Sequence, residues 1–159
     1  MYQHIVVAVD GSNTALKALE HACRLAAFTG AKLTLVNVAN PAEFMAVAPE
    51  LVQQGGYEEA AREHGESVLG EALRHAEAAG VKDAAQHLLV SVRGAKEMAA
   101  ELIDYADKEG SDLLVLGTHG RSGLMHLLMG SFTETVMRQT RVPLLVIRSN
   151  PDDEEKAAA

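Results

Sequence analysis

The 159-residue chain has one cysteine, no tryptophan and only 4% aromatic residues. A single cysteine, Cys23, excludes an internal disulfide and a cysteine-rich metal site. Because aromatic side chains are so scarce among the 48% hydrophobic residues, the core must be aliphatic. We expect Cys23 to be a small residue of that core.

Basic residues are in the minority, with 14 Lys and Arg against 22 Asp and Glu, and the net charge is −8. This balance argues against a nucleic-acid-binding surface and against binding to anionic membranes. No stretch reaches the roughly 18 apolar residues of a membrane span, and the start, MYQHIVVAVDGS, does not resemble a signal peptide. The sequence therefore predicts a cytoplasmic protein of one domain, without membrane insertion.

The last stretch, residues 149–159, reads SNPDDEEKAAA and is polar and acidic. Such a composition buries too little apolar surface to fold, so we expect a disordered tail. The folded domain then spans residues 1–148 and is nearer to neutral than the whole chain. A local basic site for an anion is compatible with that charge.

Five apolar runs have the pattern of strands buried on both faces, and they alternate with segments of helical periodicity. Residues 39–56 contain two prolines and a glycine pair, so we expect a loop with at most one helical turn. The expected strands are 5–9, 33–38, 87–92, 113–116 and 144–147, and the expected helices are about 13–29, 57–79, 95–109 and from 131 onward.

Local signals mark these helices. Ser12 can cap the first helix, and Ser131 and Glu134 have the spacing of a capping box for the last. Gly65 and Gly70 stand inside a predicted helix, where glycine costs about 1 kcal/mol relative to alanine. We expect close packing to compensate for both glycines.

Alternation of buried strands with helices indicates a parallel sheet covered by helices on both faces. Right-handed crossovers leave few topologies. We expect an α/β fold with a single-domain, doubly wound, five-stranded parallel sheet of order 3-2-1-4-5, which is Rossmann-like. Ligands of such sheets bind beyond the carboxyl ends of the strands where the order reverses, here between strands one and four.

The segment GTHGRSGLMHLLMGS follows the fourth strand and is rich in glycine, but it fits neither GxxxxGK[ST] nor GxGxxG. Gly117 and Gly120 would allow a ligand close to the backbone. Gly130 and Ser131 precede a helix, whose N-terminus favours anions. Asp10 ends the neighbouring strand, so these residues flank one crevice. The alternative is an ordinary strand-to-helix loop, with Asp10 as a helix cap.

The spacing G-x2-G-x9-G-S from Gly117 to Ser131, with VAVDGS after the first strand and VPLLVIR at the last, resembles the universal stress protein family. The resemblance covers about residues 3–148. In that family the spaced glycines mark the ATP-binding branch. The resemblance therefore implies an ATP-binding protein of the stress response, which acts as a nucleotide-dependent regulator and forms a homodimer.

The resemblance also implies a ligand site, in which adenine lies near Val38 and ribose near Asp10 and Gly117. Asp10 could also hold Mg²⁺. Phe132 stands where many family members have valine, which could alter the shape of the site. A solvated loop charge is the alternative role for Arg121. The residues that would meet the phosphates are Gly120, Arg121, Gly130, Ser131 and Thr133.

Three classes of function remain open: a regulator read by a protein partner, an enzyme such as a slow ATPase, and an assembly subunit with a structural ligand or none. The turn DGSNTA departs from the SGGxDS-like loop of adenylate-forming relatives. His119 is a possible general base, with an ordinary loop histidine as the alternative, and no second group is positioned to orient it. We expect slow hydrolysis or none.

The stretch Val142 to Ile147, which contains the last strand, is an edge in this topology and carries no charge before Arg148. An uncovered edge presents unpaired N–H and C=O groups. We therefore expect a homodimer through this strand, which a two-fold, self-complementary contact would close. Shielding of the edge by a loop or by the tail is the alternative.

Overall fold

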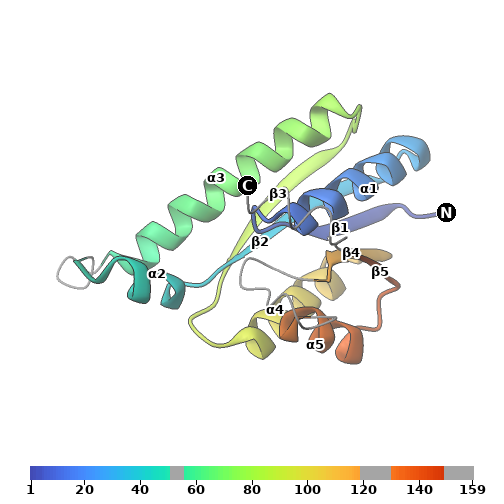
Figure 1. The fold of residues 1–159 in the computed structure, drawn as a ribbon. Helices are drawn as coiled ribbons and strands as arrows, with labels where there is room; N and C mark the ends of the chain where they lie inside the picture. The colour runs from blue at the N-terminus through green and yellow to red at the C-terminus, as the bar shows by residue number, and fades with distance from the viewer. Residues whose placement is uncertain (51–55, 119–129, 149–159) are drawn as a thin grey trace.

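The structure is a computed structural model that describes residues 1–50, 56–118 and 130–148. Figure 1 shows the helices and strands of these residues arranged in three layers. The strands are β1 (His4–Ala8), β2 (Lys32–Ala39), β3 (Ala84–Val90), β4 (Leu113–Gly117) and β5 (Leu144–Ile147). The helices are α1 (Asn13–Thr29), α2 (Ala42–Val47), α3 (Tyr57–Ala78), α4 (Ala95–Lys108) and α5 (Ser131–Gln139).

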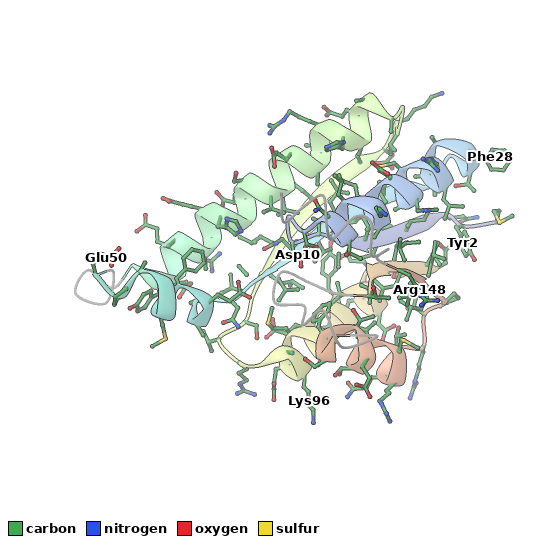
Figure 2. The ribbon with its side chains drawn as sticks, in the orientation of Figure 1. Tyr2, Asp10, Phe28, Glu50, Lys96 and Arg148 are labelled. Atoms are coloured by element: carbon green, nitrogen blue, oxygen red, sulfur yellow. The ribbon has the colours of Figure 1, made fainter. Side chains whose placement is uncertain are left out.

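The strands form one parallel sheet of order β3-β2-β1-β4-β5, which confirms the predicted fold class. β1 is central: Ile5 pairs with Leu33 of β2 and with Leu113 of β4. Helices α1 and α3 cover one face, and α4 and α5 cover the other (Figure 1). Figure 2 shows Asp10 at the carboxyl end of β1, and Tyr2 and Phe28 at the amino end of the sheet.

The core is aliphatic and lies on both faces of the sheet. Ile5 and Val7 pack beneath α1 and α3, whereas Val6 packs beneath α4 and α5, and all three are fully buried. Each such side chain contributes about 1.5–3 kcal/mol through burial. Cys23 is 2% exposed and belongs to the α1 side of this core, as predicted.

Strand β3 differs from the prediction: it begins at Ala84 instead of His87 and ends at Val90 instead of Val92. Its residues pair in parallel register with β2, from Leu33 opposite Ala84 onward. The two alanines that open the strand are poor strand formers, so local propensity misses its start. The pairing partner therefore sets this boundary.

The two glycines of α3 have different surroundings. A Cβ on Gly65 would lie 2.6 Å from Leu88 Cδ1 and 2.7 Å from Asn37 Oδ1, so the helix backbone packs directly on the sheet. A Cβ on Gly70 would meet only Arg74 Nη1, at 3.8 Å. The prediction of close packing is confirmed for Gly65 and is wrong for Gly70.

The helix boundaries follow local signals at several ends. Ser12 caps α1, because its Oγ accepts the N–H of Ala15 at 3.2 Å, and Gly30 ends the helix with φ 74°. The expected helical turn in residues 39–56 is the short helix α2. Within the described part of the chain, no helix is both long and apolar enough to cross a membrane.

Candidate functional site

The carboxyl ends of β1 and β4 lie side by side, as the strand order predicts. Val7 of β1 pairs with Val115 of β4, and β4 ends at Gly117. Asp10 follows β1 at the same edge of the sheet (Figure 2). The order of the strands reverses between β1 and β4, so Asp10 and Gly117 flank the position where ligands of doubly wound sheets bind.

The carboxylate of Asp10 is oriented by the turn that follows it. Its Oδ1 accepts the backbone N–H of Ser12 at 2.9 Å. Gly11 lies between them with φ 84°, in a region that other residues rarely adopt. Because Ser12 provides the cap of α1, the alternative of Asp10 as that cap is wrong. Asp10 instead stands half-buried in front of the helix.

The packing of β4 against α1 accounts for the glycine at position 117. A Cβ on Gly117 would lie 2.6 Å from Thr14 Cγ2 and 3.2 Å from the backbone carbon of Thr14. Thr14 belongs to the first turn of α1 and is 8% exposed, so it has little room to move. A glycine is therefore required here whether or not a ligand is bound.

The start of α5 is fastened to the end of β4. The hydroxyl of Thr133 donates to the carbonyl of Gly117 at 2.8 Å. The N–H of Gly130 donates to the carbonyl of Thr118 at 2.8 Å, and the N–H of Thr118 donates to Ile147 at 2.9 Å. Gly117, Gly130 and Thr133, which are predicted site residues, therefore come together at one place.

The capping box predicted for Ser131 and Glu134 is wrong. Gly130 is the N-cap of α5, and Ser131 is its first helical residue and is exposed. The carboxylate of Glu134 lies 2.9 Å from Arg138 Nη2, in an exposed ion pair one turn along the helix. The predicted start of the helix at residue 131 is confirmed, but its N-cap is Gly130, whose N–H donates to the carbonyl of Thr118.

Val38 and Phe132, the predicted apolar contacts of a ligand, lie on the same face of the sheet. Both are partly buried, and both pack against the hydrophobic cluster beneath α4 and α5. Gly120, Arg121 and the possible base His119 lie outside the described residues.

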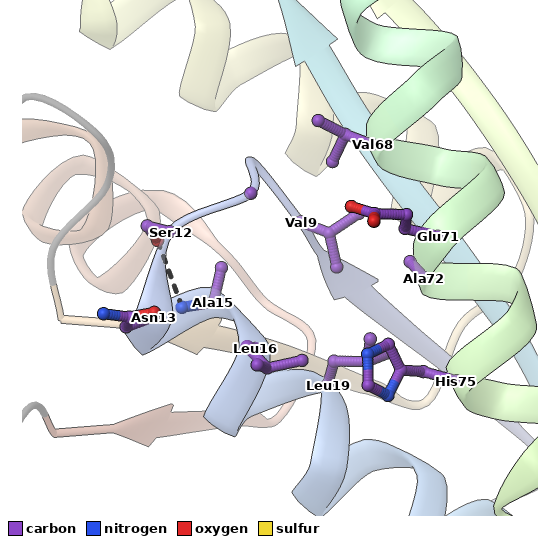
Figure 3. A pocket seen from close by; sticks show the side chains of 11 residues that line it. Val9, Ser12, Asn13, Ala15, Leu16, Leu19, Val68, Glu71, Ala72 and His75 are labelled. Atoms are coloured by element: carbon purple, nitrogen blue, oxygen red, sulfur yellow. Dashed lines mark hydrogen bonds between the residues drawn. The ribbon is translucent and has the colours of Figure 1, made fainter. Parts of the chain in front are cut away.

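A groove of about 270 Å³ lies between α1 and α3, on the opposite face of the sheet from Val38 (Figure 3). Leu19 and Ala72 line its apolar part, and Glu71 and His75 project toward it from successive turns of α3. Sequence analysis missed it, because two helices distant along the chain form it together. In the structure Glu71 and His75 are exposed and stand one turn apart on α3, with buried Ala72 next to Glu71.

Three observations concern the metal-binding, thiol and carboxylate side chains of the described residues. Among them, no three His, Cys, Asp or Glu side chains gather into a metal-binding group. Burial, with the nearby charge of Glu20, raises the pKa of Cys23 to about 11, so its thiol stays protonated near neutral pH. Asp10, the acid of the predicted site, is engaged by the N–H of Ser12.

The sequence profile of the universal stress protein family matches residues 1–148. A universal stress protein of Methanocaldococcus jannaschii is 32% identical over 151 residues, which cover 93% of this chain and 83% of that protein. A universal stress protein of Mycobacterium tuberculosis is 30% identical over 148 residues, which cover 93% of this chain and 97% of that protein.

A solved structure of a universal stress protein in complex with cAMP is similar in fold, with a TM-score of 0.67. Its sequence is 28% identical, and the match covers 94% of this chain and 98% of that one. The profile match extends over the whole sheet and over each predicted site residue. The chain belongs to the universal stress protein family, as the spacing of its glycines predicted.

Proposed function

We propose that this protein binds an adenine nucleotide, ATP with Mg²⁺ in the first place, and that a protein partner reads the bound state. The observation that carries the proposal is the meeting of Asp10, the end of β4 and the start of α5 at the switch point of the sheet. The family member solved with cAMP supports an adenine nucleotide as the ligand.

The base and the sugar fit the described residues by their chemistry. An adenine ring would pack on the apolar side chains of Val38 and Phe132, on the α4 and α5 face of the sheet. The ribose hydroxyls would donate to the carboxylate of Asp10, beside Gly117. Bare phosphates would be repelled by this carboxylate, so the sugar or a cation is the better partner for Asp10.

The phosphates would lie at the start of α5. Among the described residues no side chain caps this helix, so its first-turn N–H groups and its dipole suit an anion. The Thr133 hydroxyl donates to the carbonyl of Gly117, so Thr133 would contribute its backbone N–H, with the N–H of Ser131 beside it. The N–H of Gly130 donates to the carbonyl of Thr118, so Gly130 would allow a close approach of the phosphates without donating to them. By the sequence motif, Gly120 would add a close backbone approach and Arg121 a charge-assisted bond.

Magnesium is compatible with a single carboxylate at this site. Mg²⁺ in nucleotide sites is usually held by one or two carboxylates and by the phosphates, with water completing the octahedron. Asp10 would supply the protein ligand, and the ion would reduce the phosphate charge. No second acid is required for this arrangement.

Hydrolysis should be slow or absent. The described residues place no base next to a group that would orient it, and Asp10 accepts a hydrogen bond from its own turn. Enzymes commonly turn over at about 1–10³ per second. We expect far less for ATP here, and sustained turnover near 10 per second by the pure protein would overturn this part of the proposal.

Two measurements test the proposed function. Mass spectrometry of the small molecules released by denaturing the purified protein should detect an adenine nucleotide. Titration calorimetry with ATP, ADP and cAMP, with and without Mg²⁺, should show binding. Failure of all three nucleotides to bind would contradict the proposal and leave the assembly subunit as the alternative.

The position of the site is tested by the double variant Gly120→Val, Gly130→Val, which should abolish binding. Gly130 has φ −73° and ψ 157°, which valine adopts without strain, so the change need not disturb the backbone there. Gly117 is a poor choice, because any Cβ there would collide with Thr14. Gly70→Ala, on the open side of α3, is the control, and unchanged ATP affinity in the double variant would contradict the assignment.

A further inference from the structure

Asn37 is a buried polar residue near the carboxyl end of β2. Asn37 is only 5% exposed, and its Nδ2 donates to the carbonyl of Val9 at 2.8 Å. Burial of an amide is costly unless it is hydrogen-bonded. This bond therefore fixes both the Asn37 amide and the Val9 carbonyl.

The bond stands where the backbone pairing of β1 with β2 ends. The N–H of Val9 donates to Val36 at 2.8 Å, and the chain then leaves the sheet. The Val9 carbonyl belongs to the planar peptide unit that continues into the nitrogen of Asp10. Holding that oxygen sets the orientation of the peptide and with it the position of Asp10.

Helix α3 holds the Asn37 amide from the other side. A Cβ on Gly65 would lie 2.7 Å from Asn37 Oδ1 and 2.6 Å from Leu88 Cδ1, so the amide fills the space that the glycine leaves. The amide thus has the Val9 carbonyl on one side and the backbone of α3 on the other. A chain of contacts runs from Gly65 through Asn37 and Val9 to Asp10.

We propose that Asn37 is a positioning residue for nucleotide binding: it holds Asp10 in place for the ribose or the metal ion, and α3 holds Asn37. The effect of Asn37 on nucleotide binding rests on the proposed function, whereas the contacts of Asn37 do not depend on it. Asn37 does not touch the nucleotide in this account. It acts through the Val9–Asp10 peptide and the turn that ends at Ser12.

The test compares two variants of the same strand. Asn37→Leu keeps the branched shape and removes the donor. Thr34→Val removes another buried polar group of β2, whose Oγ lies 2.8 Å from His4 Nε2 at the opposite end of the sheet. Loss of one well-made hydrogen bond corresponds to about a tenfold change in an equilibrium constant.

Two readouts are taken. Calorimetry with Mg-ATP should show the Kd rising about tenfold in Asn37→Leu and less than about twofold in Thr34→Val. Hydrogen exchange of the Ser12 amide, followed by NMR without nucleotide, should accelerate in Asn37→Leu by a similar factor and stay near wild type in Thr34→Val. Equal changes in both variants would mean that Asn37 is merely structural.

Each outcome decides a separate statement. If the wild type binds no adenine nucleotide, the proposed function fails, and Ser12 exchange alone decides whether Asn37 holds the Asp10 turn. An Asn37→Leu protein with unchanged Kd and unchanged Ser12 exchange overturns the inference. If Asn37→Leu does not fold, Gly65→Ala replaces it, because the added methyl displaces the amide while the donor remains. Unchanged affinity and exchange in folded Gly65→Ala would likewise overturn it.

Discussion

The hydroxyl of Thr133, in the first turn of α5, donates a 2.8 Å hydrogen bond to the carbonyl of Gly117, the last residue of β4. This bond joins the end of β4 to the first turn of α5. It keeps the start of the helix against the edge of the sheet where the nucleotide is proposed to bind. Its contribution to the stability of the fold can be measured by removing the hydroxyl.

Thr133→Val should lower the free energy of unfolding by about 1–2 kcal/mol, because the part-buried carbonyl of Gly117 loses a donor without a change of side-chain shape. Thr135→Val is the matched control, since its hydroxyl donates to Ser131 within the same helix. We expect a smaller loss there, of about 0.5 kcal/mol or less. Urea unfolding measures both, and equal losses would show that the Gly117 contact has no special role.

Gly65→Ala and Gly70→Ala should change stability in opposite directions, although both lie in α3. The methyl group added at Gly65 has no space between Leu88 and Asn37, so the protein should lose about 1–3 kcal/mol. At Gly70 the methyl meets only the end of Arg74, and the protein should gain up to about 1 kcal/mol of helix propensity. Thermal unfolding decides the signs, and two changes of the same sign would contradict the packing described.

Val146→Lys should weaken a homodimer that we propose to form through β5. On its outer side β5 has no neighbouring strand among the described residues, and its four residues are only half-buried. A lysine would bring a charge into the paired edges. Light scattering should show a dimer for the wild type and more monomer for the variant.

The control for this experiment is Val92→Lys, which places the same change just beyond the other edge strand, β3. Val92 is 71% exposed and should tolerate the charge without effect on the oligomer. A wild-type protein that remains monomeric at micromolar concentration would end the proposal. Equal weakening by the two variants would show that the added charge does not act through β5, and an unchanged dimer in Val146→Lys would place the interface elsewhere.

The stability of the fold should fall in alkaline solution, partly through Cys23. Burial raises the pKa of this thiol from 9.0 to about 11, so the unfolded chain releases the proton at lower pH than the folded one. The contribution is therefore complete below about pH 9 and is lost as the pH rises toward about 11. Cys23→Ala should flatten the loss of stability over this range.

Tyr105 contributes in the same direction, because burial and the charge of Glu109 raise its pKa as well. The comparison of Cys23→Ala with the wild type isolates the thiol from this background. Alkylation by iodoacetamide near pH 8.5 gives a second check and should be at least about tenfold slower in the native protein than in urea. Rapid native alkylation would contradict the burial of Cys23.

The sequence by itself determined the strands of the parallel sheet and the helices between them, and the order of the strands followed from the few topologies that right-handed crossovers leave. Parallel strands that are buried on both faces are written as uninterrupted apolar runs, and the helices between them carry their own period. The apolar runs and the helical period are both local, so they can be recognised without knowing which elements pack against them. The same holds for Ser12 as a cap and for the glycine spacing that identified the family.

Pairing and packing decided what these local signals miss. The start of β3 at Ala84 follows from its register with β2, against the preference of its own residues. Gly130, and not Ser131, is the N-cap of α5, and its N–H donates to the carbonyl of Thr118, so the spacing of Ser131 and Glu134 does not make a capping box. Both features depend on residues of another part of the chain, so the local sequence does not show them.

The tertiary structure also decided why particular residues are required. Gly117 is a glycine because Thr14 lies against it, and Gly65 is one because Asn37 and Leu88 lie against it. These pairs are distant along the chain and meet only after the crossovers bring α1 and α3 onto the sheet. The sequence shows that a glycine is present, but only the packing around it shows what the missing side chain makes room for.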